Sequence, residues 1–286
     1  MALIALIVVT AVWGVTFVQV KDAVEVYPLY AFLAIRFAIA SAALAPLALR
    51  RVRTSGAAIS VVLGLLLAAG YALQTEGLAR TTVSSTGFIT GLYVIFTPLL
   101  ALAFFRQRIG AAAWIGVALS VIGLALLSGI HEGSVTGNAL VLAASAVYSL
   151  QIVLLERAAP RLDPLPLTFV EMLAAWVAFT AIAGARSEFE VPHGWTVWGA
   201  LLVTGVFASA LGYLVQSWAQ RRTSATRTAL VFAMEPVWAA LFGFTLAGDR
   251  LGALGWTGCA LILAGIVVAE PTTALALQRM NLLSSD

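Results

Sequence analysis

The chain contains the same unit twice. Gly70–Thr81 (GYALQTEGLART) recurs as Gly212–Thr223 (GYLVQSWAQRRT), and the two segments share Gly, Tyr, Gln, Arg and Thr at five of twelve positions. The same spacing, here called the repeat offset, relates Arg108–Gly123 to Arg250–Gly265, where eight of sixteen positions coincide. Unrelated apolar segments would share about one or two residues over such lengths. Because both copies must adopt the same supersecondary structure, this duplication constrains the fold more than any other feature.

The chain also carries enough apolar sequence to cross a membrane many times. It is 62% hydrophobic and 10% charged, whereas soluble domains carry about 25% charged residues. A span needs about 20 apolar residues, and in lipid each must be a helix, because only a helix satisfies its own backbone amides. The ten expected spans cover residues 2–20, 29–49, 57–78, 83–105, 111–130, 137–155, 165–184, 196–218, 225–247 and 253–270.

The duplication and the spans together predict an all-α integral membrane protein with two inverted five-helix repeats around a central cavity. We expect the first repeat over residues 1–130, the second over 137–270 and a cytoplasmic tail over 271–286, in one compact membrane domain. Five spans per repeat is an odd number, so the second copy enters the membrane upside down. Inverted repeats allow a central site to face the two sides of the membrane alternately. The alternative is that duplication only builds a stable bundle.

Basic residues in the loops predict the orientation. One side of the expected topology carries ten of them and the other carries four, which are Lys21, Arg80, Arg186 and Arg250. The positive-inside rule therefore places both termini in the cytoplasm.

Several short motifs in order resemble the EamA family of the drug/metabolite transporter superfamily. They are Ala11–Gly14 (AVWG), Arg36 with the Phe that follows it, Pro98, Glu235–Leu241 (EPVWAAL) and Gly248–Leu251 (GDRL). The resemblance covers essentially the whole chain. It implies a basket of helices around a central cavity, lined mainly by spans 1, 3, 4, 6, 8 and 9, with spans 5 and 10 at the periphery.

The resemblance also implies a function. Family members often export amino acids and other small metabolites from bacteria, which implies a place in the bacterial inner membrane. The chain departs from the family pattern at Gln107, which takes the position of Asp249 in the first copy, where an acid is common.

An aromatic residue followed three positions later by a hydrogen-bonding side chain occurs in four of the spans expected to line the cavity. Residues three apart share a helix face, so each pair offers a ring and a polar group side by side. The depth of these residues, at about 1.5 Å per residue, predicts an outer aromatic layer and an inner one, formed by the first two and the last two pairs. Interhelix packing is the alternative interpretation. The pairs are Trp13/Thr16, Tyr71/Gln74, Tyr148/Gln151 and Tyr213/Gln216.

Three further residues complete the expected substrate-binding set, and two prolines are expected hinges. Thr90 and Tyr93 share a face of the fourth span, and Trp238 lies in the EPVWAAL motif. Pro98 and Pro236 should kink the fourth and ninth spans, since proline removes a backbone donor. The spacing of the two prolines departs from the repeat offset by one helical turn, so we expect kinks that are not strictly symmetric.

Charged residues at membrane depth are costly and indicate functional sites. Glu235 is expected near the midplane, as a ligand for a substrate ammonium or as the coupling site for a proton. Arg36 could extend to the outer surface, bind a substrate carboxylate or, as we favour, pair with Glu235. Glu171 is expected close enough to the inner face to be solvated.

These features favour a secondary transporter that exports small metabolites, with amino acids as the most plausible class. The expected partners are a small-molecule substrate and the lipid bilayer, and two alternatives stay open for the energy source: proton-coupled transport, in which a proton is a further partner, and facilitative transport. No metal, cofactor or nucleic acid is expected, and the absence of HExxH, GxSxG and paired membrane aspartates argues against an enzyme. The alternatives are a sugar-phosphate or drug exchanger, an intramembrane enzyme and a non-transporting sensor.

Glycines spaced by seven in spans 5 and 10 are expected to permit close helix packing, within the fold or between the protomers of a dimer. The oligomer is therefore expected to be a monomer or a homodimer. These glycines are Gly116, Gly123, Gly258 and Gly265.

Overall fold

The computed structural model describes residues 1–52, 56–128, 134–242, 245 and 252–269, and within these ranges every regular element is a helix. The expected tail over 271–286 and the Gly248–Leu251 motif lie outside the described residues. The α-helices are α1 Ala2–Val26, α2 Leu29–Ala48, α3 Ala57–Leu78, α4 Val83–Gly91, α5 Tyr93–Phe105, α6 Ala111–Ser128, α7 Val135–Ala158, α8 Pro164–Ala185, α9 Gly194–Leu202, α10 Gly212–Gln220, α11 Ala225–Phe232, α12 Glu235–Phe242 and α13 Ala253–Ala269. Two 3₁₀ turns, η1 Leu49–Arg51 and η2 Ala159–Arg161, and the π-helix η3 Val203–Leu211 complete the set.

The helices make the chain a multi-pass membrane protein. Seven of the described helical segments are long and apolar enough to cross a membrane, and α6 and α13 are shorter apolar helices. Large apolar side chains lie exposed on the outer surfaces of these helices, as a lipid-facing surface requires. They include Ile4, Val8, Leu65, Phe104, Phe207 and Val267.

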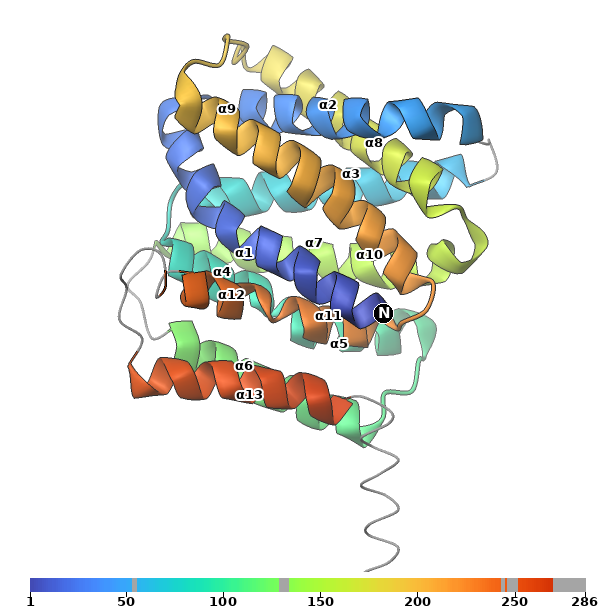
Figure 1. Ribbon diagram of the computed structural model, residues 1–286, viewed down its shortest axis with the longest axis vertical. Helices are drawn as coiled ribbons and strands as arrows, with labels where there is room; N and C mark the ends of the chain where they lie inside the picture. The colour runs from blue at the N-terminus through green and yellow to red at the C-terminus, as the bar shows by residue number, and fades with distance from the viewer. Residues whose placement is uncertain (53–55, 129–133, 243–244, 246–251, 270–286) are drawn as a thin grey trace, which may run out of the picture.

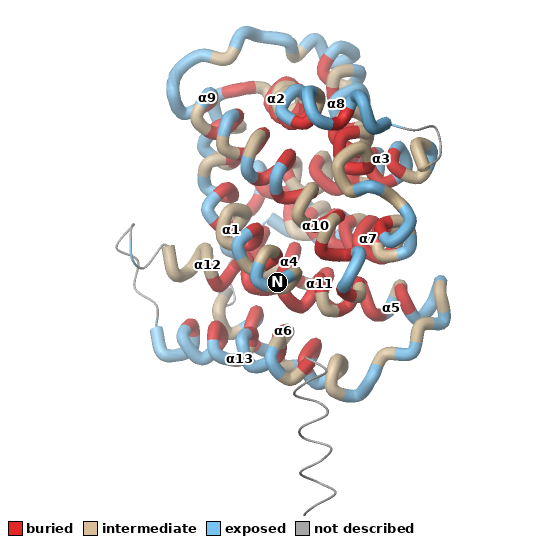
Figure 2. Tube along the Cα trace, turned by 45° about the vertical axis from the view of Figure 1, so that its right-hand side comes forward, coloured by how far each residue is buried: buried red, intermediate tan, exposed pale blue. Residues whose placement is uncertain are grey.

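The helices lie across the long axis of the molecule and form a stack (Figure 1). Helices α2 and α8 pack together at one end of this stack, and α6 and α13 pair at the other end. The elements of spans 1, 3, 4, 6, 8 and 9 lie between these two pairs, and buried residues are concentrated where they meet (Figure 2). The fifth and tenth spans, α6 and α13, are therefore peripheral, as the resemblance implied.

Glycines hold α6 and α13 together in an antiparallel pair. A Cβ atom on Gly116 would lie 2.6 Å from the carbonyl oxygen of Gly265, and one on Gly123 would lie 2.6 Å from that of Gly258. Gly258 is the copy of Gly116, and Gly265 is the copy of Gly123. The two contacts are therefore equivalent to each other. The glycines thus pack within the fold, which is one of the two expected roles.

The fourth and ninth spans are each interrupted, at equivalent positions. Helix α4 ends before Leu92 and α11 ends before Ala233 and Met234. Leu92 and Met234 are separated by the repeat offset, and each N–H bonds the carbonyl three residues earlier, at 3.1 Å and 3.0 Å. The two helix breaks are therefore equivalent, although the two prolines are not.

The prolines relate differently to the two interruptions. Pro98 lies inside α5, six residues after the break in the fourth span, so the break itself is not at the proline. Pro236 lies in the first turn of α12, directly after the break in the ninth span. A first-turn proline is tolerated because no intrahelical acceptor is available for that N–H.

The first and sixth spans pack in the same way against two equivalent glycines. This equivalence was not visible in the sequence repeat. The ring of Tyr148 lies against Gly70, and the indole of Trp13 lies against Gly212. Gly70 and Gly212 are copies, so Trp13 and Tyr148 occupy equivalent places. The spacing from Trp13 to Tyr148, here called the N-terminal offset, is shorter than the repeat offset. The repeat therefore extends to the start of both halves.

The π-helix η3 accommodates one extra residue in the second copy. Gly64 lies against the carbonyl of Glu171 and Gly205 against the carbonyl of Arg36, so the two glycines are equivalent. The spacing from Gly64 to Gly205 is shorter by a single residue than the spacing from Gly70 to Gly212. One residue has thus been inserted within η3, and widening the helix to π geometry absorbs it.

Candidate functional site

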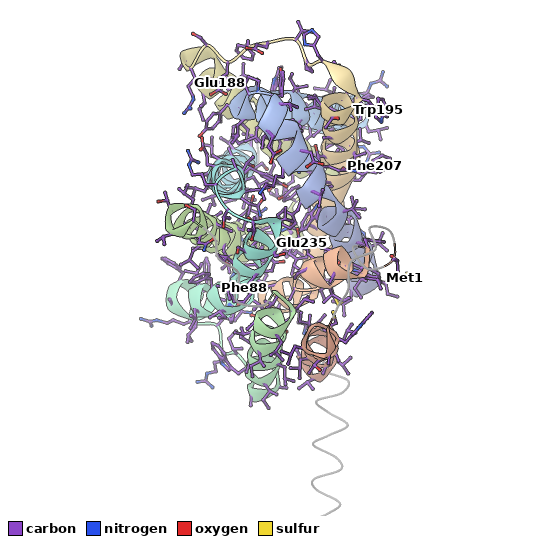
Figure 3. The ribbon with its side chains drawn as sticks, turned by 90° about the vertical axis from the view of Figure 1, so that its left-hand side faces the viewer. Met1, Phe88, Glu188, Trp195, Phe207 and Glu235 are labelled. Carbon is purple, nitrogen blue, oxygen red and sulfur yellow. The ribbon has the colours of Figure 1, made fainter. Side chains whose placement is uncertain are left out.

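The residues expected to bind substrate line one cavity in the middle of the helix stack. Its empty volume is about 660 Å³, including the part open to solvent. Ten of the eleven expected substrate-binding residues line it, together with Arg36 and Glu235. Glu235 lies in the interior of the molecule, whereas Trp195 and Phe207 lie at its surface (Figure 3). The ten are Trp13, Thr16, Tyr71, Gln74, Thr90, Tyr93, Tyr148, Gln151, Tyr213 and Gln216.

The four aromatic rings of the expected layers form one continuous cluster. Trp13 lies 5.5 Å from Tyr213, Tyr213 lies 6.3 Å from Tyr71, and Tyr71 lies 5.7 Å from Tyr148, between ring centroids. Each residue predicted for the outer layer thus contacts one predicted for the inner layer. The prediction of two separate layers is therefore wrong. The rings are large enough to bridge the small difference in depth between their helix positions.

Arg36 presents a buried positive charge to the cavity. Its Nε donates to Ser209 Oγ at 2.9 Å and its Nη2 donates to the Tyr71 hydroxyl at 3.0 Å. The guanidinium carbon lies 4.4 Å from the centroid of the Tyr71 ring, a cation–π contact. Within the described residues the ion pairs lie elsewhere, so the expected pairing of Arg36 with Glu235 is wrong. The hydrogen-bond partners of the guanidinium among the described residues are hydroxyl groups and include no carboxylate.

Glu235 presents a carboxyl group to the same cavity from the start of α12. Its Oε2 lies 3.5 Å from the hydroxyl of Tyr93, the far limit of a hydrogen bond. Tyr93 and Glu235 are themselves separated by the repeat offset and so are copies of each other. The cavity therefore contains one cationic and one acidic group, each held by a tyrosine.

The other polar groups around the cavity are mostly hydrogen-bonded. Gln74 Nε2 donates to Thr90 Oγ1 at 3.0 Å, and the Tyr148 hydroxyl donates to Gln74 Oε1 at 3.0 Å. Trp13 Nε1 donates to the carbonyl of Ala208, in the π-helix, at 2.9 Å. These residues thus form hydrogen bonds between helices, as the alternative interpretation expected, and also line the cavity.

A glutamine chain, Gln151, Gln216 and Gln220, joins α7 to α10. Gln216 Nε2 lies 3.1 Å from Gln151 Oε1 and 3.0 Å from Gln220 Oε1. Gln220 Nε2 donates to the carbonyl of Ile152 at 2.8 Å. The chain closes the cavity between these two helices.

The cavity extends further toward one side than the other. It reaches Val20 and Leu78, near the ends of α1 and α3 that precede Lys21 and Arg80. The equivalents of Val20 and Leu78 in the second half are Leu155 and Gln220, and neither lines the cavity. Equivalent residues are thus separated by the cavity on one side and packed together on the other.

Glu171 and Ser209 lie behind the cavity wall and bond residues that line it, and the expected set lacked both. Glu171 is fully buried, so its predicted solvation at the inner face is wrong. Its Oε1 accepts a hydrogen bond of 3.3 Å from Gln151 Nε2. The N-terminal offset pairs Glu171 with Arg36 and was the signal that could have identified it. Ser209 lies within the π-helix, and its contact with Arg36 had no sequence signal.

Trp238 lies outside the cavity wall, so its expected place there is wrong. Its ring stacks on Phe242 at 6.0 Å between centroids, and its Cβ lies near Gly14 on α1. One helical turn after Glu235, it falls on the face of α12 that packs against α1.

Comparison with known proteins identifies relatives of the whole chain. The model of the EamA-like transporter family matches residues 1–129 and 135–269. An uncharacterized transporter from Archaeoglobus fulgidus is 28% identical over 268 residues, which cover 93% of this chain and 85% of the relative. A solved crystal structure with 18% identity has the same fold, with a TM-score of 0.79 over 96% of this chain and 97% of the other.

The names of two further relatives state the substrate that each exports. A probable terminal-alkyne amino-acid exporter from Streptantibioticus cattleyicolor is 24% identical over 94% of this chain and 93% of its own. The threonine/homoserine exporter RhtA from Salmonella typhimurium is 28% identical over 64% of this chain and 61% of its own.

Proposed function

Because the chain belongs to the EamA-like transporter family, we propose that it is a secondary transporter that exports amino acids by alternating access. The observation that carries this proposal is that two buried ionisable groups, the guanidinium of Arg36 and the carboxyl group of Glu235, line one cavity without pairing with each other. An amino acid is a zwitterion and supplies the missing partner of each charge. The names of two exporter relatives agree with this substrate class.

Substrate binding follows from the two charged groups. The guanidinium of Arg36 binds the substrate carboxylate in a charge-assisted, bidentate manner. Glu235 accepts the ammonium group, with help from the carbonyl of Phe232 at the C-terminal end of α11, where the last carbonyls lack helical donors. The aromatic cluster contacts the substrate side chain.

The proposed architecture is ten transmembrane helices in two inverted repeats. The antiparallel glycine contacts of α6 and α13 support it, as do contacts between residues and their own copies. The hydroxyls of Tyr71 and Tyr213, which are copies of each other, lie 3.1 Å apart. A residue that contacts its own copy lies close to a two-fold axis, and an axis in the membrane plane is the one that inverted repeats have.

The proposed orientation puts both termini in the cytoplasm of a bacterium, in its inner membrane. The bias of basic residues supports it. With this orientation the cavity opens outward, toward Val20 and Leu78, and the glutamine chain closes the cytoplasmic side. The structure then represents the outward-facing state of the cycle.

The test is transport by purified protein in proteoliposomes. Labelled amino acids, their methyl esters, sugar phosphates and other metabolites are compared as substrates. We expect exchange of amino acids and not of esters, because the ester lacks the carboxylate that Arg36 binds. Arg36→Gln should reduce the preference for the acid over the ester about tenfold or more, since a charge-assisted hydrogen bond contributes about 1.5–3 kcal/mol.

Arg186→Gln is the matched control, because Arg186 is an exposed arginine outside the cavity. Equal exchange of acids and esters by a folded protein would contradict the proposal. Exchange of sugar phosphates in place of amino acids would favour the other class of carrier.

A further inference from the structure

One acidic group has no place in the proposed substrate site. Glu171, on α8, is fully buried, and its Oε2 is a buried atom with no hydrogen-bond partner among the described residues. Its Oε1 has one partner, the neutral amide of Gln151. An ionised carboxylate at this depth, with one amide donor, is strongly disfavoured. These surroundings favour the neutral, protonated carboxyl group over the ionised one in this conformation.

Ionisable groups on the elements around Glu171 do not compensate its charge. Among the described residues, none of them forms an ion pair or a hydrogen bond with it, and α8 carries no other ionisable side chain. These groups are Tyr30 and Arg36 on α2, Arg50 and Arg51 in η1, Tyr71 and Glu76 on α3, Tyr148, Glu156 and Arg157 on α7, and Tyr213 on α10.

The glutamine chain lies between Glu171 and the cavity. Gln151 lines the cavity and donates to Glu171, whereas Glu171 is not part of the cavity wall. Gln216, which also lines the cavity, has a buried Oε1 without a partner among the described residues. A substrate in the cavity is therefore separated from Glu171 by the Gln151 side chain, and a proton from the cavity would have to pass this side chain to reach it.

The repeat predicts what happens to Glu171 when the cavity faces the other side. Glu171 is the copy of Arg36, and the main chains at both residues pack on equivalent glycines, Gly64 and Gly205. Arg36 lines the cavity in the present state. When the two halves exchange roles, the glutamine chain separates and Glu171 takes the lining position that Arg36 has now.

We propose that Glu171 is the proton-binding site through which a pH gradient drives transport, an inference that rests on the proposed function. Its carboxyl group releases a proton to water in the cytoplasm-facing cavity and takes one up from water in the outward-facing cavity. Each cycle thus moves one proton inward as one substrate molecule leaves. Glu235 binds substrate, and Glu171 binds the proton.

The test compares two kinds of transport by Glu171→Gln in proteoliposomes. Substrate counterflow at equal pH needs no net proton movement, so the variant should retain it. Accumulation driven by a gradient of one pH unit reaches up to about tenfold for one coupled proton. The variant should show no accumulation, and a pH dye in the lumen should record proton movement with substrate for the wild-type protein alone. Glu25→Gln, at an exposed acid near the end of α1, is the matched control.

The outcomes separate this inference from the proposed function. Accumulation by Glu171→Gln equal to that of the wild-type protein, or wild-type accumulation without proton movement, would overturn the inference and leave the exporter intact. Absence of counterflow in the wild-type protein would overturn the exporter. If the variant fails to transport, an infrared difference spectrum between the wild-type protein and the variant still tests the protonation state of Glu171. The carbonyl band of a protonated acid at neutral pH is expected, and carboxylate bands in its place would overturn the inference.

Discussion

The cavity keeps two opposite charges apart by giving each a neutral partner. Arg36 bonds Ser209 and the Tyr71 hydroxyl, and its guanidinium lies over the Tyr71 ring. Glu235 has only the distant hydroxyl of Tyr93 among the described residues. Neutral partners hold the charged groups in position without cancelling their charge, so a zwitterionic substrate gains two ionic contacts on entering.

The two central tyrosines test whether Tyr71 positions Arg36. Tyr71 and Tyr213 share one hydrogen bond at 3.1 Å, and only Tyr71 also accepts from Arg36. Tyr71→Phe should therefore weaken amino-acid binding about tenfold, the effect of about 1.4 kcal/mol. Tyr213→Phe, which removes the same shared bond, should change binding by less than about threefold. Titration calorimetry measures the amino-acid affinity of both variants. Equal losses of affinity would contradict the prediction and would show that the two hydroxyls contribute only to packing.

Local spacing predicted the cavity residues well and the acid behind them poorly. The ring and the polar group three residues apart on one helix are visible in the sequence, so Tyr71/Gln74 and Tyr213/Gln216 could be predicted. Glu171 is a single acid about two turns from a helix end, and its partner Gln151 is on another helix. Nothing local separates such a residue from one that is solvated at the membrane surface.

At the scale of elements, departures from the regular α-helix surround the cavity. The fourth and ninth spans break at Leu92 and Met234, and the eighth span widens to π geometry over Val203–Leu211. The π-helix supplies the carbonyl of Ala208 to Trp13 and the hydroxyl of Ser209 to Arg36. Irregular helices are tolerated at membrane depth where they line a cavity, because other groups there satisfy the freed backbone.

Sequence reasoning found the elements and misjudged their irregularities. Pro98 was the visible candidate for the kink of the fourth span, yet the helix breaks at Leu92, whose side chain gives no signal. The extra residue in η3 lies in a run of small apolar residues where the two copies share little sequence. Only the packing of Gly64 and Gly205 reveals it.

The stability of the protein should depend on the close glycine contacts between α6 and α13. A Cβ atom on Gly258 would lie 2.5 Å from the Gly123 carbonyl and 2.7 Å from the Leu127 nitrogen, and both are rigid backbone atoms. Gly258→Ala should therefore destabilise the protein by about 1–3 kcal/mol, a typical cost of overpacking. Thermal unfolding in detergent measures the change.

Gly110→Ala is the control for this prediction, because a Cβ atom at Gly110 meets nothing within 4 Å. An unchanged melting temperature for Gly258→Ala would show that α6 and α13 can separate without cost.

At the scale of the whole molecule, equivalent contacts differ between the two halves. In the second half, Gln151, Gln216 and Gln220 join α7 to α10. Their equivalents in the first half, Thr16, Gln74 and Leu78, line the cavity between α1 and α3. Two similar halves in different arrangements are what the proposed alternating access would require, because each half would then adopt the arrangement of the other.

The distances between two equivalent pairs of helix ends test this account most directly. Asp22 and Arg80 lie at the ends of α1 and α3, and Arg157 and Arg222, their equivalents, at the ends of α7 and α10; all four are exposed. Spin labels at each pair, in a Cys259→Ser background, report the opening of each side by pulsed electron resonance. We predict that an amino-acid substrate shortens the Asp22–Arg80 distance and lengthens the Arg157–Arg222 distance in the same molecules. Distances that stay fixed, or that change in the same direction, would contradict alternating access.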